Sequence, residues 1–340
     1  MKVAFYISDH GFGHITRNLQ VARELLDRDY EVLIVTGQRQ CLIASDYLRN
    51  RAQTVICNTD AGLAVQPGEI SIDVQTTIKK VRNHVSSWNE RISECVDADV
   101  YVVDIVPWSL LGARKKGIPS ILMTSFTWIE QYEPFLPHEL LDCYKNAFSL
   151  ADRVFYYELA NPSCRKFLGD GIDVGFAARE INSDEAARIR SRFNRPVVFI
   201  SLGMSNSGLA QEFSVDALPY DFIVTSTVNL TGSNVVRLSP DNPNTQDFIA
   251  ASDFCICKAG WSTVAEAMIA GVPFAALNRP DVAEDTMTIS MLEQRGCGIG
   301  VEIEELNHIE EIIQRLKKLN GVEKHKNNSR MIADLIVGAE

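Results

Sequence analysis

Apolar residues along this chain occur in two alternating patterns. Val3–Ile7 is a short apolar run, and after a glycine-containing loop apolar side chains recur at helical spacing until a second apolar run at Glu31–Thr36. Runs of this length are typical of buried strands, whereas the intervening spacing is typical of an amphipathic helix. A strand, a loop, a helix and a strand within about 35 residues form a βαβ unit, which predicts a parallel sheet.

The same alternation continues along the chain. Further strands are expected at Thr54–Cys57, Val100–Val103, Ser120–Thr124, Arg153–Tyr157, Val197–Leu202, Phe222–Thr225, Val235–Leu238, Asp253–Cys257, Val272–Leu277 and Gly298–Val301. Helices are expected around Thr76–Cys95, Trp108–Lys116, His138–Leu150, Ser183–Phe193, Gln246–Ala251, Thr263–Ala270, Asp285–Gln294 and Glu304–Leu319.

A cluster of Asn, Pro and Gly interrupts this alternation and divides it into two series. We therefore expect an N-terminal Rossmann-like domain at 1–160, an interdomain connection at 161–180 and a second Rossmann-like domain at 181–340. The polar segment Asn320–Arg330 precedes a last apolar stretch, and the last helix is free to pack back on the N-terminal domain. The predicted fold class is α/β, with two doubly wound domains.

Composition excludes several classes of protein. With 46% hydrophobic residues over 340 positions, the chain is too apolar for a disordered protein, and each half is long enough to bury its own core. No apolar run reaches the ~18 residues of a membrane span, and the first run is too short for a signal peptide. The eight cysteines include no CxxC pair. We therefore expect reduced thiols, no metal site and a cytoplasmic protein.

The net charge of -11 is unevenly distributed. Residues 1–170 carry 18 basic and 21 acidic side chains, and residues 171–340 carry 15 and 23, which gives net charges of -3 and -8. A chain this acidic lacks the electrostatic footprint of a general nucleic-acid binder. Small anionic ligands stay possible, because backbone N–H groups and one cation can hold them locally.

The first glycine loop, Gly11-Phe12-Gly13-His14, joins the first strand to the first helix. Ligands of doubly wound sheets bind at such strand ends, and an imidazole there can act as a general base near neutral pH. A solvent-facing histidine at the helix start fits the same position. The third glycine of a GxGxxG nucleotide motif is replaced by Thr16, and no acidic residue ends the second strand, which argues against an NAD enzyme.

Two more loops follow strands in the second half. The first, with Gly203 and Ser205, is by itself a weak signal. The second is Lys258-Ala259-Gly260-Trp261-Ser262-Thr263, followed by Glu266. A glycine and two hydroxyl residues at a helix start can hold a diphosphate, with Lys258 as a cation and Glu266 as an acceptor for ribose hydroxyls. A capping box formed by Thr263 and Glu266 explains those two residues equally well. The loop lacks the order of a Walker A motif, which argues against a kinase.

This second loop resembles the donor-binding signature of GT-B glycosyltransferases. The plant-type UDP-glycosyltransferases carry HCGWNSTLE and then GVP, and Gly260, Trp261, Glu266 and Gly271-Val272-Pro273 match this pattern. Lys258 replaces the histidine of that signature. The family also has an acidic residue and a glutamine that contact the donor sugar. Here Glu284 and Asp285 lie in the corresponding region, and Thr286 replaces the glutamine.

The N-terminal half agrees with this resemblance. The GxGHxTR core, with Gly11, Gly13, His14, Thr16 and Arg17, resembles the acceptor-side loop of the bacterial lipid-linked N-acetylglucosaminyltransferase. In plant-type enzymes the histidine of this loop is the general base, and it is paired with an aspartate.

The segment Val102–Trp108 resembles the element that carries this aspartate, which makes Asp104 the partner implied for His14. An isolated Asp104 would also suit a helix N-cap. A closer likeness is to the N-terminal domain of plant arabinokinases and their bacterial stand-alone relatives, over GFGHITR, Asp104–Pro107, Gly117–Pro119 and Ser125–Trp128. The kinase domain of those plant enzymes is absent from this sequence.

The resemblance implies a GT-B enzyme whose two Rossmann-like domains face each other across a cleft that holds the active site. The second domain would bind a nucleotide-sugar, expected to be a UDP-sugar, as co-substrate and without a further cofactor. Its diphosphate would lie on Gly203, Ser205, Lys258, Gly260, Trp261, Ser262 and Thr263, its ribose on Glu266 and its sugar near Glu284 and Asp285. His14, oriented by Asp104, would deprotonate an acceptor hydroxyl for an inverting, metal-independent transfer.

Two other functions fit the same residues. A nucleotide-sugar hydrolase on this fold would use the same histidine to activate water. A non-catalytic nucleotide-sugar-binding protein would need neither His14 nor Asp104. The acceptor is not identified by the sequence and could be a small molecule, a glycan or a lipid-linked sugar. Trp88, Trp108, Trp128 and Tyr132 suit an acceptor pocket, but core packing is the preferred interpretation. The basic cluster Lys79–Arg82 suits a solvated helix face.

Overall fold

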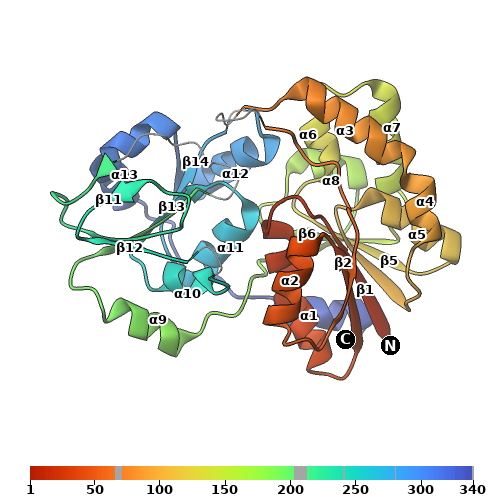
Figure 1. Cartoon of the computed structure of the whole chain (residues 1–340), viewed down its shortest axis with the longest axis horizontal. Coiled ribbons are helices and arrows are strands. Elements are labelled where there is room, and N and C mark those ends of the chain that lie inside the picture. The colour runs from red at the N-terminus through yellow and green to blue at the C-terminus, as the bar shows by residue number, and fades with distance from the viewer. Residues whose placement is uncertain (66–70, 203–212, 240–241, 280, 339–340) are drawn as a thin grey trace. The chain divides into compact units, whose positions relative to one another are not determined.

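Parallel strands organise both halves of the chain in the computed structural model, which describes residues 1–65, 71–202, 213–239, 242–279 and 281–338 (Figure 1). Two units result. Unit 1 comprises Met1–Ala64, Ile72–Ala178 and Asn327–Glu340, and unit 2 comprises Val65–Ser71 and Arg179–Lys326. The expected α/β class is confirmed, because each unit contains a parallel sheet with helices between successive strands.

The strands described for unit 1 form one seven-stranded sheet in the order β3-β2-β1-β4-β5-β6-β7. Every neighbouring pair in it is parallel. Its central strands are buried along their whole length, which explains why they are continuous apolar runs in the sequence. The strands are β1 (Lys2–Ile7), β2 (Glu31–Thr36), β3 (Gln53–Ile56), β4 (Val100–Asp104), β5 (Ser120–Thr124), β6 (Arg153–Tyr157) and β7 (Ile172–Gly175).

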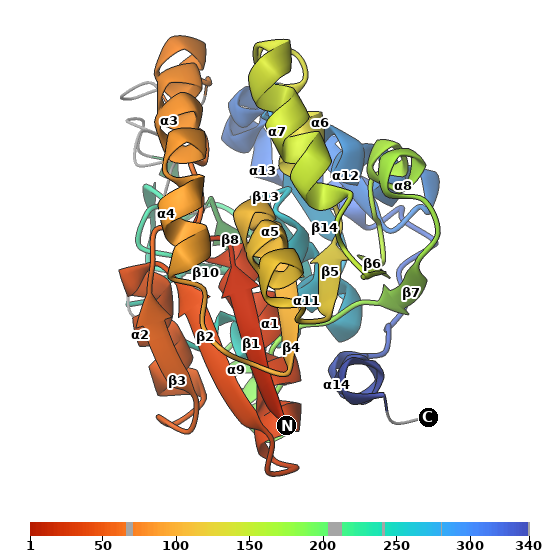
Figure 2. The same cartoon turned by 90° about the vertical axis from the view of Figure 1, so that its right-hand side faces the viewer.

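Helices cover both faces of this sheet. They are α1 (Gly13–Leu26), α2 (Gln38–Tyr47), α3 (Val74–Ser86), α4 (Trp88–Ser93), α5 (Pro107–Lys116), α6 (Trp128–Tyr132), α7 (His138–Phe148), α8 (Pro162–Leu168) and α14 (Ser329–Val337). Ala4 and Tyr6 of β1 face one way and pack with apolar residues of α3, α4, α5 and α7. Val3 and Phe5 face the other way, because side chains alternate along a strand. The dark-blue helix α14 contacts α1 (Figure 2).

Unit 2 contains a six-stranded parallel sheet in the order β12-β10-β8-β13-β14-β15 and a short pair, β9 with β11. The strands are β8 (Val197–Ser201), β9 (Phe213–Ser214), β10 (Asp221–Val224), β11 (Leu230–Thr231), β12 (Val235–Arg237), β13 (Phe254–Lys258), β14 (Phe274–Leu277) and β15 (Gly298–Val301). The helices are α9 (Ser183–Arg190), α10 (Thr245–Ala250), α11 (Trp261–Ala270), α12 (Ala283–Gln294), the 3₁₀ helix η1 (Ile303–His308) and α13 (Ile309–Leu316).

Three of the predicted segments have a different structure. The helix expected at Thr76–Cys95 is two helices, since Ser87 ends α3 and precedes α4. The helix expected at Glu304–Leu319 begins as η1, and its amphipathic part is α13. The segment 161–180, expected as an interdomain connection, contains α8 and the edge strand β7 of unit 1. Asn161 caps α8 and Pro162 begins it, so the residues that suggested a turn are a helix start.

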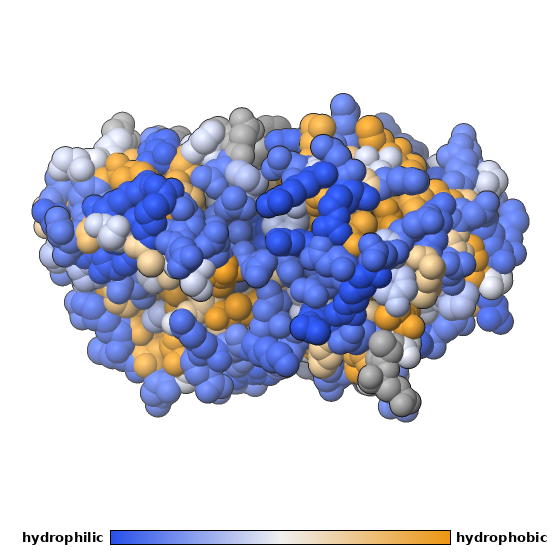
Figure 3. Space-filling view, turned by 90° about the horizontal axis from the view of Figure 1, so that it is seen from below, coloured by the Kyte–Doolittle hydropathy of each residue, from blue (hydrophilic) through white to orange (hydrophobic). Residues whose placement is uncertain are grey.

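Hydrophilic residues cover most of the face shown in Figure 3, with hydrophobic residues in scattered groups. The apolar residues of the sheets are largely buried: Val3, Phe5, Val102 and Val103 are inaccessible to solvent. Among the helices that the structure describes, none combines the length and the apolar character that crossing a membrane requires.

Candidate functional site

The glycine loop after β1 positions His14 at the start of α1. Gly11 has a φ of 76°, a left-handed conformation that glycine adopts without strain. The loop is held from the side by Gln40 of α2, whose Nε2 donates to the Asp9 and Gly11 carbonyl oxygens at 2.7 Å each. Gly13 is the first helical residue, which places His14 in the first turn of α1.

Asp104 is the last residue of β4, the strand next to β1, and it pairs in register with Ile7. This register brings it to His14: Nδ1 of His14 lies 2.8 Å from Oδ1 of Asp104. Both side chains are buried, with 9% of the His14 side chain and 1% of Asp104 exposed. The next residue, Ile105, has a φ of 52°, an unusual conformation for a β-branched residue and the kind of strain that clusters at functional sites.

Arg17 and Asn18 complete the surroundings of Asp104. Nε of Arg17 donates to Oδ2 at 2.6 Å, and its Nη2 donates to Oδ1. Nδ2 of Asn18 donates to Oδ2 at 2.5 Å. The guanidinium of Arg17 also donates to Oγ of Ser125 at 3.2 Å and lies over the ring of Tyr157. Three side-chain N–H groups, two of Arg17 and one of Asn18, therefore hold the Asp104 carboxylate from one face of α1.

These contacts determine the charge state of the pair. Burial alone would raise the pKa of Asp104, but Arg17 and His14 outweigh it and hold this pKa well below its usual range. Asp104 is therefore an anion at neutral pH. Nδ1 of His14 faces both an acceptor and a donor, because it lies 2.8 Å from Oδ1 of Asp104 and 2.9 Å from Nη2 of Arg17. In the tautomer with a hydrogen on Nδ1, this hydrogen is donated to Asp104, and the lone pair of the ring is on Nε2, where it can accept a proton.

In unit 2, β13 ends at Lys258 and α11 begins at Trp261, with Gly260 as its N-cap. A capping box with Thr263 as N-cap is therefore not formed, because Thr263 lies inside the first turn. A Cβ on Gly260 would lie 3.9 Å from Nζ of Lys258, so this ammonium lies beside the helix start. The N–H of Trp261 donates to Oε1 of Glu284 at 3.1 Å, so a carboxylate already occupies part of this N-terminus.

Glu266, one turn further into α11, is paired with an arginine that the sequence did not indicate. Nε and Nη2 of Arg179 donate to its Oε1 at 3.0 and 2.7 Å, and both side chains are more than nine-tenths buried. Nη2 of Arg179 also donates to Oγ1 of Thr245 at 2.9 Å. Arg179 is the first residue of unit 2 after the chain leaves unit 1 at Ala178. Glu266 thus fixes the point where the chain enters unit 2.

Asp285 likewise has a partner within its own unit. Nε and Nη2 of Arg279 donate to its two oxygens at 2.5 and 2.8 Å, and Asp285 is fully buried. Burial lowers the pKa of Lys258, and Arg279 adds to this effect, whereas Asp285 and Glu284 oppose it. Two cations and two carboxylates thus form a balanced cluster around the start of α11.

The remaining predicted residues fall into three groups. Gly203 and Ser205 lie outside the described residues. Thr16 lies on α1, where its Oγ1 donates to the Gly13 carbonyl at 3.0 Å. Trp88, Trp108, Trp128 and Tyr132 all belong to one hydrophobic core of unit 1, which agrees with the preferred interpretation of these aromatic residues. Asn18 and Arg179 had no motif that would mark them in the sequence, and neither the contact of Ser125 with Arg17 nor the pairing of Arg17 with Asp104 was expected.

Comparisons with known proteins agree with this architecture. Residues 224–336 match the model of the glycosyltransferase family 28 C-terminal domain. L-arabinokinase of Arabidopsis thaliana is 26% identical over 313 residues, which cover 87% of this chain and 30% of that protein. The chain thus spans less than a third of the length of this curated relative.

Two solved structures show the same fold over the whole chain. The calicheamicin glycosyltransferase CalG4 is 15% identical with a TM-score of 0.64, and the match covers 99% of this chain and 97% of CalG4. MurG of Acinetobacter baumannii is 16% identical with a TM-score of 0.57, over 99% of this chain and 100% of MurG. The expected resemblance is confirmed: the chain has the fold of the GT-B glycosyltransferases and carries a glycosyltransferase family 28 C-terminal domain at residues 224–336.

Proposed function

We propose that this protein is an inverting, metal-independent glycosyltransferase that moves a sugar from a nucleotide-sugar, a UDP-sugar in the first instance, to an acceptor hydroxyl. The family 28 domain and the fold support the reaction class. The single observation that carries the mechanism is the contact of 2.8 Å between Nδ1 of His14 and the buried carboxylate of Asp104. A protein that only binds a nucleotide-sugar would need neither His14 nor Asp104.

The proposed reaction is one displacement. Nε2 of His14 takes the proton of the acceptor hydroxyl, the acceptor oxygen forms a bond to the anomeric carbon, and the bond from that carbon to the diphosphate breaks. The nucleoside diphosphate leaves with the bonding electron pair, and the configuration inverts. Asp104 stabilises the imidazolium that forms, as an orienting carboxylate does in a catalytic triad.

On the donor side, the start of α11 and the Lys258 ammonium favour a diphosphate. The contact between Glu284 and the Trp261 N–H would have to open when the diphosphate binds. The Glu266 carboxylate has one oxygen, Oε1, bound twice by Arg179, so a ribose hydroxyl would be held by Oε2.

Replacement of the proposed base tests the mechanism. We expect His14→Ala to lower transfer from a UDP-sugar by about 10²- to 10⁴-fold, because general-base catalysis contributes on that order. UDP affinity, measured by calorimetry, should stay within about twofold, because His14 belongs to unit 1 and the proposed diphosphate residues belong to unit 2. His138→Ala, an exposed histidine at the start of α7, is the matched control.

The assay measures UDP release with and without an acceptor, and it is repeated in EDTA to test the metal-independent mechanism. The anomeric configuration of the product is determined as well. Full activity of His14→Ala would contradict the proposed base, and loss of activity in EDTA would contradict the metal-independent mechanism. UDP release from wild type at the same rate without any acceptor would instead identify a nucleotide-sugar hydrolase. UDP binding without release under either condition would leave only the binding-protein function.

A further inference from the structure

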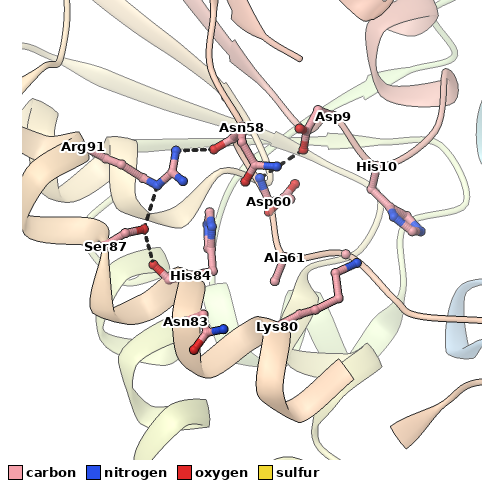
Figure 4. Close-up of a pocket in the computed structure, with 11 residues that line it drawn as sticks. Asp9, His10, Asn58, Asp60, Ala61, Lys80, Asn83, His84, Ser87 and Arg91 are labelled. Atoms are coloured by element: carbon pink, nitrogen blue, oxygen red, sulfur yellow. Dashed lines mark hydrogen bonds between the residues drawn. The ribbon is translucent and has the colours of Figure 1, made fainter. Parts of the chain in front are cut away.

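Unit 1 contains a pocket that is lined mostly by residues with polar side chains and by none of the predicted site residues. Its volume is about 470 Å³, within the range of small-molecule sites. Helix α3 contributes one wall and the loops after β1 and β3 the other, as Figure 4 shows. The lining residues are Asp9, His10, Asn58, Asp60, Ala61, Gly62, Lys80, Asn83, His84, Ser87 and Arg91. Ala61 and Gly62 are the only residues without a polar side chain among them.

Asp60 is poorly satisfied in this pocket. It is 5% exposed, and neither of its carboxyl oxygens lies within hydrogen-bond distance of a partner among the described residues, although the Ser8 and Trp128 side chains lie close enough to lower its pKa. Burial raises the pKa of Asp60 well above its usual value, and the nearby Asp9 and Asp104 charges add to this, whereas Ser8 and Trp128 offset only part of it. A protonated carboxyl group offers one donor and a carbonyl acceptor at the same place. Buried groups of this kind are normally satisfied, so a missing partner calls for a ligand or water.

His84 presents a second unsatisfied atom. Its ring is buried, and burial together with Arg91 lowers the pKa of His84 to about 4, although a hydrogen bond to the Thr59 carbonyl opposes this. The ring is therefore neutral at physiological pH, and within the described part of the chain its Nε2 has no partner. In Figure 4 the His84 ring points from α3 toward the segment with Asn58 and Asp60.

The charged groups of the pocket are of both signs. Lys80 makes no hydrogen bond or ion pair to another described residue, whereas Arg91 donates to the Asn58 carbonyl and to Oγ of Ser87. Asp9 accepts the Asp60 N–H at 3.0 Å. A cationic ligand would meet Lys80 and Arg91, and an anionic ligand would meet Asp9. An apolar ligand would leave Asp60 and His84 unsatisfied, which is costly.

Several hydroxyl groups together satisfy these atoms, because one can donate to Nε2 of His84, one can accept from Lys80, and one can donate to or accept from Asp60. We propose that this pocket binds a neutral, hydroxyl-rich small molecule of the sugar or cyclitol class. This assignment rests on the proposed function, in which that molecule is the acceptor of the transferred sugar. Of the acceptors that the sequence leaves open, this proposal favours a small polar molecule over a lipid-linked sugar.

The pocket adjoins the His14 site through shared elements of unit 1. Asp9 and His10 belong to the loop that leads into His14. The ring of His10 lies 5.4 Å from that of Trp128, which contacts Phe126, and Phe126 lies 5.9 Å from the ring of His14. The Asp104 charge is the smallest of the influences that raise the pKa of Asp60. The pocket and the His14 site are thus linked through the loop after β1 and through this series of aromatic rings.

Saturation-transfer NMR on the full-length chain tests the assignment directly, with D-glucose, D-galactose and myo-inositol as probes and no nucleotide-sugar present. We expect at least one polyol to receive saturation from wild type. Lys80→Ala should weaken its binding at least about fivefold, because a hydrogen bond to a charged group is lost. Lys79→Ala is the matched control, since it removes the same side chain from the next position of α3, outside the pocket.

Asp60→Leu should abolish polyol binding, because it replaces the carboxyl group with an apolar side chain that can neither donate nor accept a hydrogen bond. Should this variant fail to fold, Lys80→Ala still carries the test, because Lys80 is exposed. The proposal is overturned if no probe binds to wild type, or if Lys80→Ala binds the probe as Lys79→Ala does.

Transfer kinetics separate this proposal from the function on which it rests. We expect Lys80→Ala to raise the acceptor KM at least about fivefold and to leave the donor KM unchanged. Polyol binding without transfer from any nucleotide-sugar would contradict the proposed function but support the pocket. Transfer with an unchanged acceptor KM in Lys80→Ala would contradict the pocket but support the function.

Discussion

Two buried aspartates in unit 1 have opposite electrostatic environments. Asp104 accepts hydrogen bonds from Arg17 and Asn18 and contacts Nδ1 of His14, and its pKa is held well below the usual range. Asp60 has no hydrogen-bond partner among the described residues, and burial raises its pKa. The first is a fixed anion that orients a histidine, and the second is a neutral group that can both donate and accept. Divergent pKa values of neighbouring carboxyl groups are typical of sites that use two protonation states.

The environment of Asp60 predicts a pH-dependent gain of stability in Asp60→Asn. Below about pH 4 the aspartate is protonated in both the folded and the unfolded chain, so the two proteins should differ little. At higher pH the unfolded chain releases this proton and the folded chain keeps it, so wild type should lose stability relative to Asp60→Asn. The expected slope is about 1.4 kcal/mol per pH unit until the folded pKa is passed.

Urea unfolding at a series of pH values measures this difference. Asp46→Asn, an exposed aspartate on α2, is the control and should follow wild type at every pH. A constant difference between Asp60→Asn and wild type from pH 4 to pH 8 would show that Asp60 ionises normally.

At the level of elements, the start of α11 combines two roles. Gly260 caps the helix without a side chain, and the carboxylate of Glu284, from the first turn of α12, accepts the Trp261 N–H. A helix N-terminus favours one anion at a time. Glu284 and the diphosphate of a donor therefore compete for the same N–H groups under the proposed function.

This competition predicts the effect of Glu284→Gln on donor binding. We expect the variant to bind UDP about two- to fivefold more tightly, since a charge at a helix N-terminus is worth about 0.3–1 kcal/mol. Calorimetry with UDP and with a UDP-sugar measures it, and Glu293→Gln on the same helix is the control. Weaker binding of the UDP-sugar alone, with unchanged UDP binding, would instead support the expected contact of Glu284 with the donor sugar.

The regular elements were largely predictable, because buried parallel strands are apolar runs and their helices are amphipathic. Helix α2 was missed because Gln40, Cys41 and Ala44 are its only buried residues, which gives no apolar periodicity. Strand β7 was missed because it is a polar edge strand: Ile172 and Asp173 are exposed. In both cases tertiary contacts, not the local pattern, decide the structure.

Only the site residues that belong to a recognisable sequence motif were predictable. His14 and Asp104 were identified from their motifs, and the structure brings them together. The face shared by His14, Arg17 and Asn18 at helical spacing was visible in the sequence, but its target was not, because Asp104 lies 87 residues from Arg17. The pairing of Arg179 with Glu266 spans the same separation and has no local signal.

At the level of the whole molecule, the last helix belongs to the first unit. Helix α14 contacts α1. Arg28, which follows the C-cap of α1, pairs with Asp334, and Arg153 of β6 donates to the Leu335 carbonyl at 3.0 Å. Ile332 and Ala333 of α14 are fully buried. Unit 1 is thus completed by residues that follow all of unit 2 in the sequence.

This arrangement predicts that Ile332→Ala destabilises unit 1. The expected loss is about 2–5 kcal/mol, the usual cost of such a truncation in a core. Urea unfolding followed by tryptophan fluorescence in a Trp261→Phe background reports on unit 1, because Trp88, Trp108 and Trp128 belong to it. Arg330→Ala, an exposed position on the same helix, should change stability by less than about 0.5 kcal/mol. Equal stability of the two variants would show that α14 contributes little to unit 1.

Because α14 lies at the end of the sequence, unit 1 cannot be completed until the whole chain has been synthesised. The strands and helices of unit 1 up to Ala178 emerge first, but α14 emerges only after Arg179–Lys326. At ~5–20 residues per second, these roughly 150 residues delay α14 by about 7–30 s. During that interval the apolar surface of α1 that α14 later covers is open to solvent, so the nascent chain has a predictable window in which chaperones can bind it.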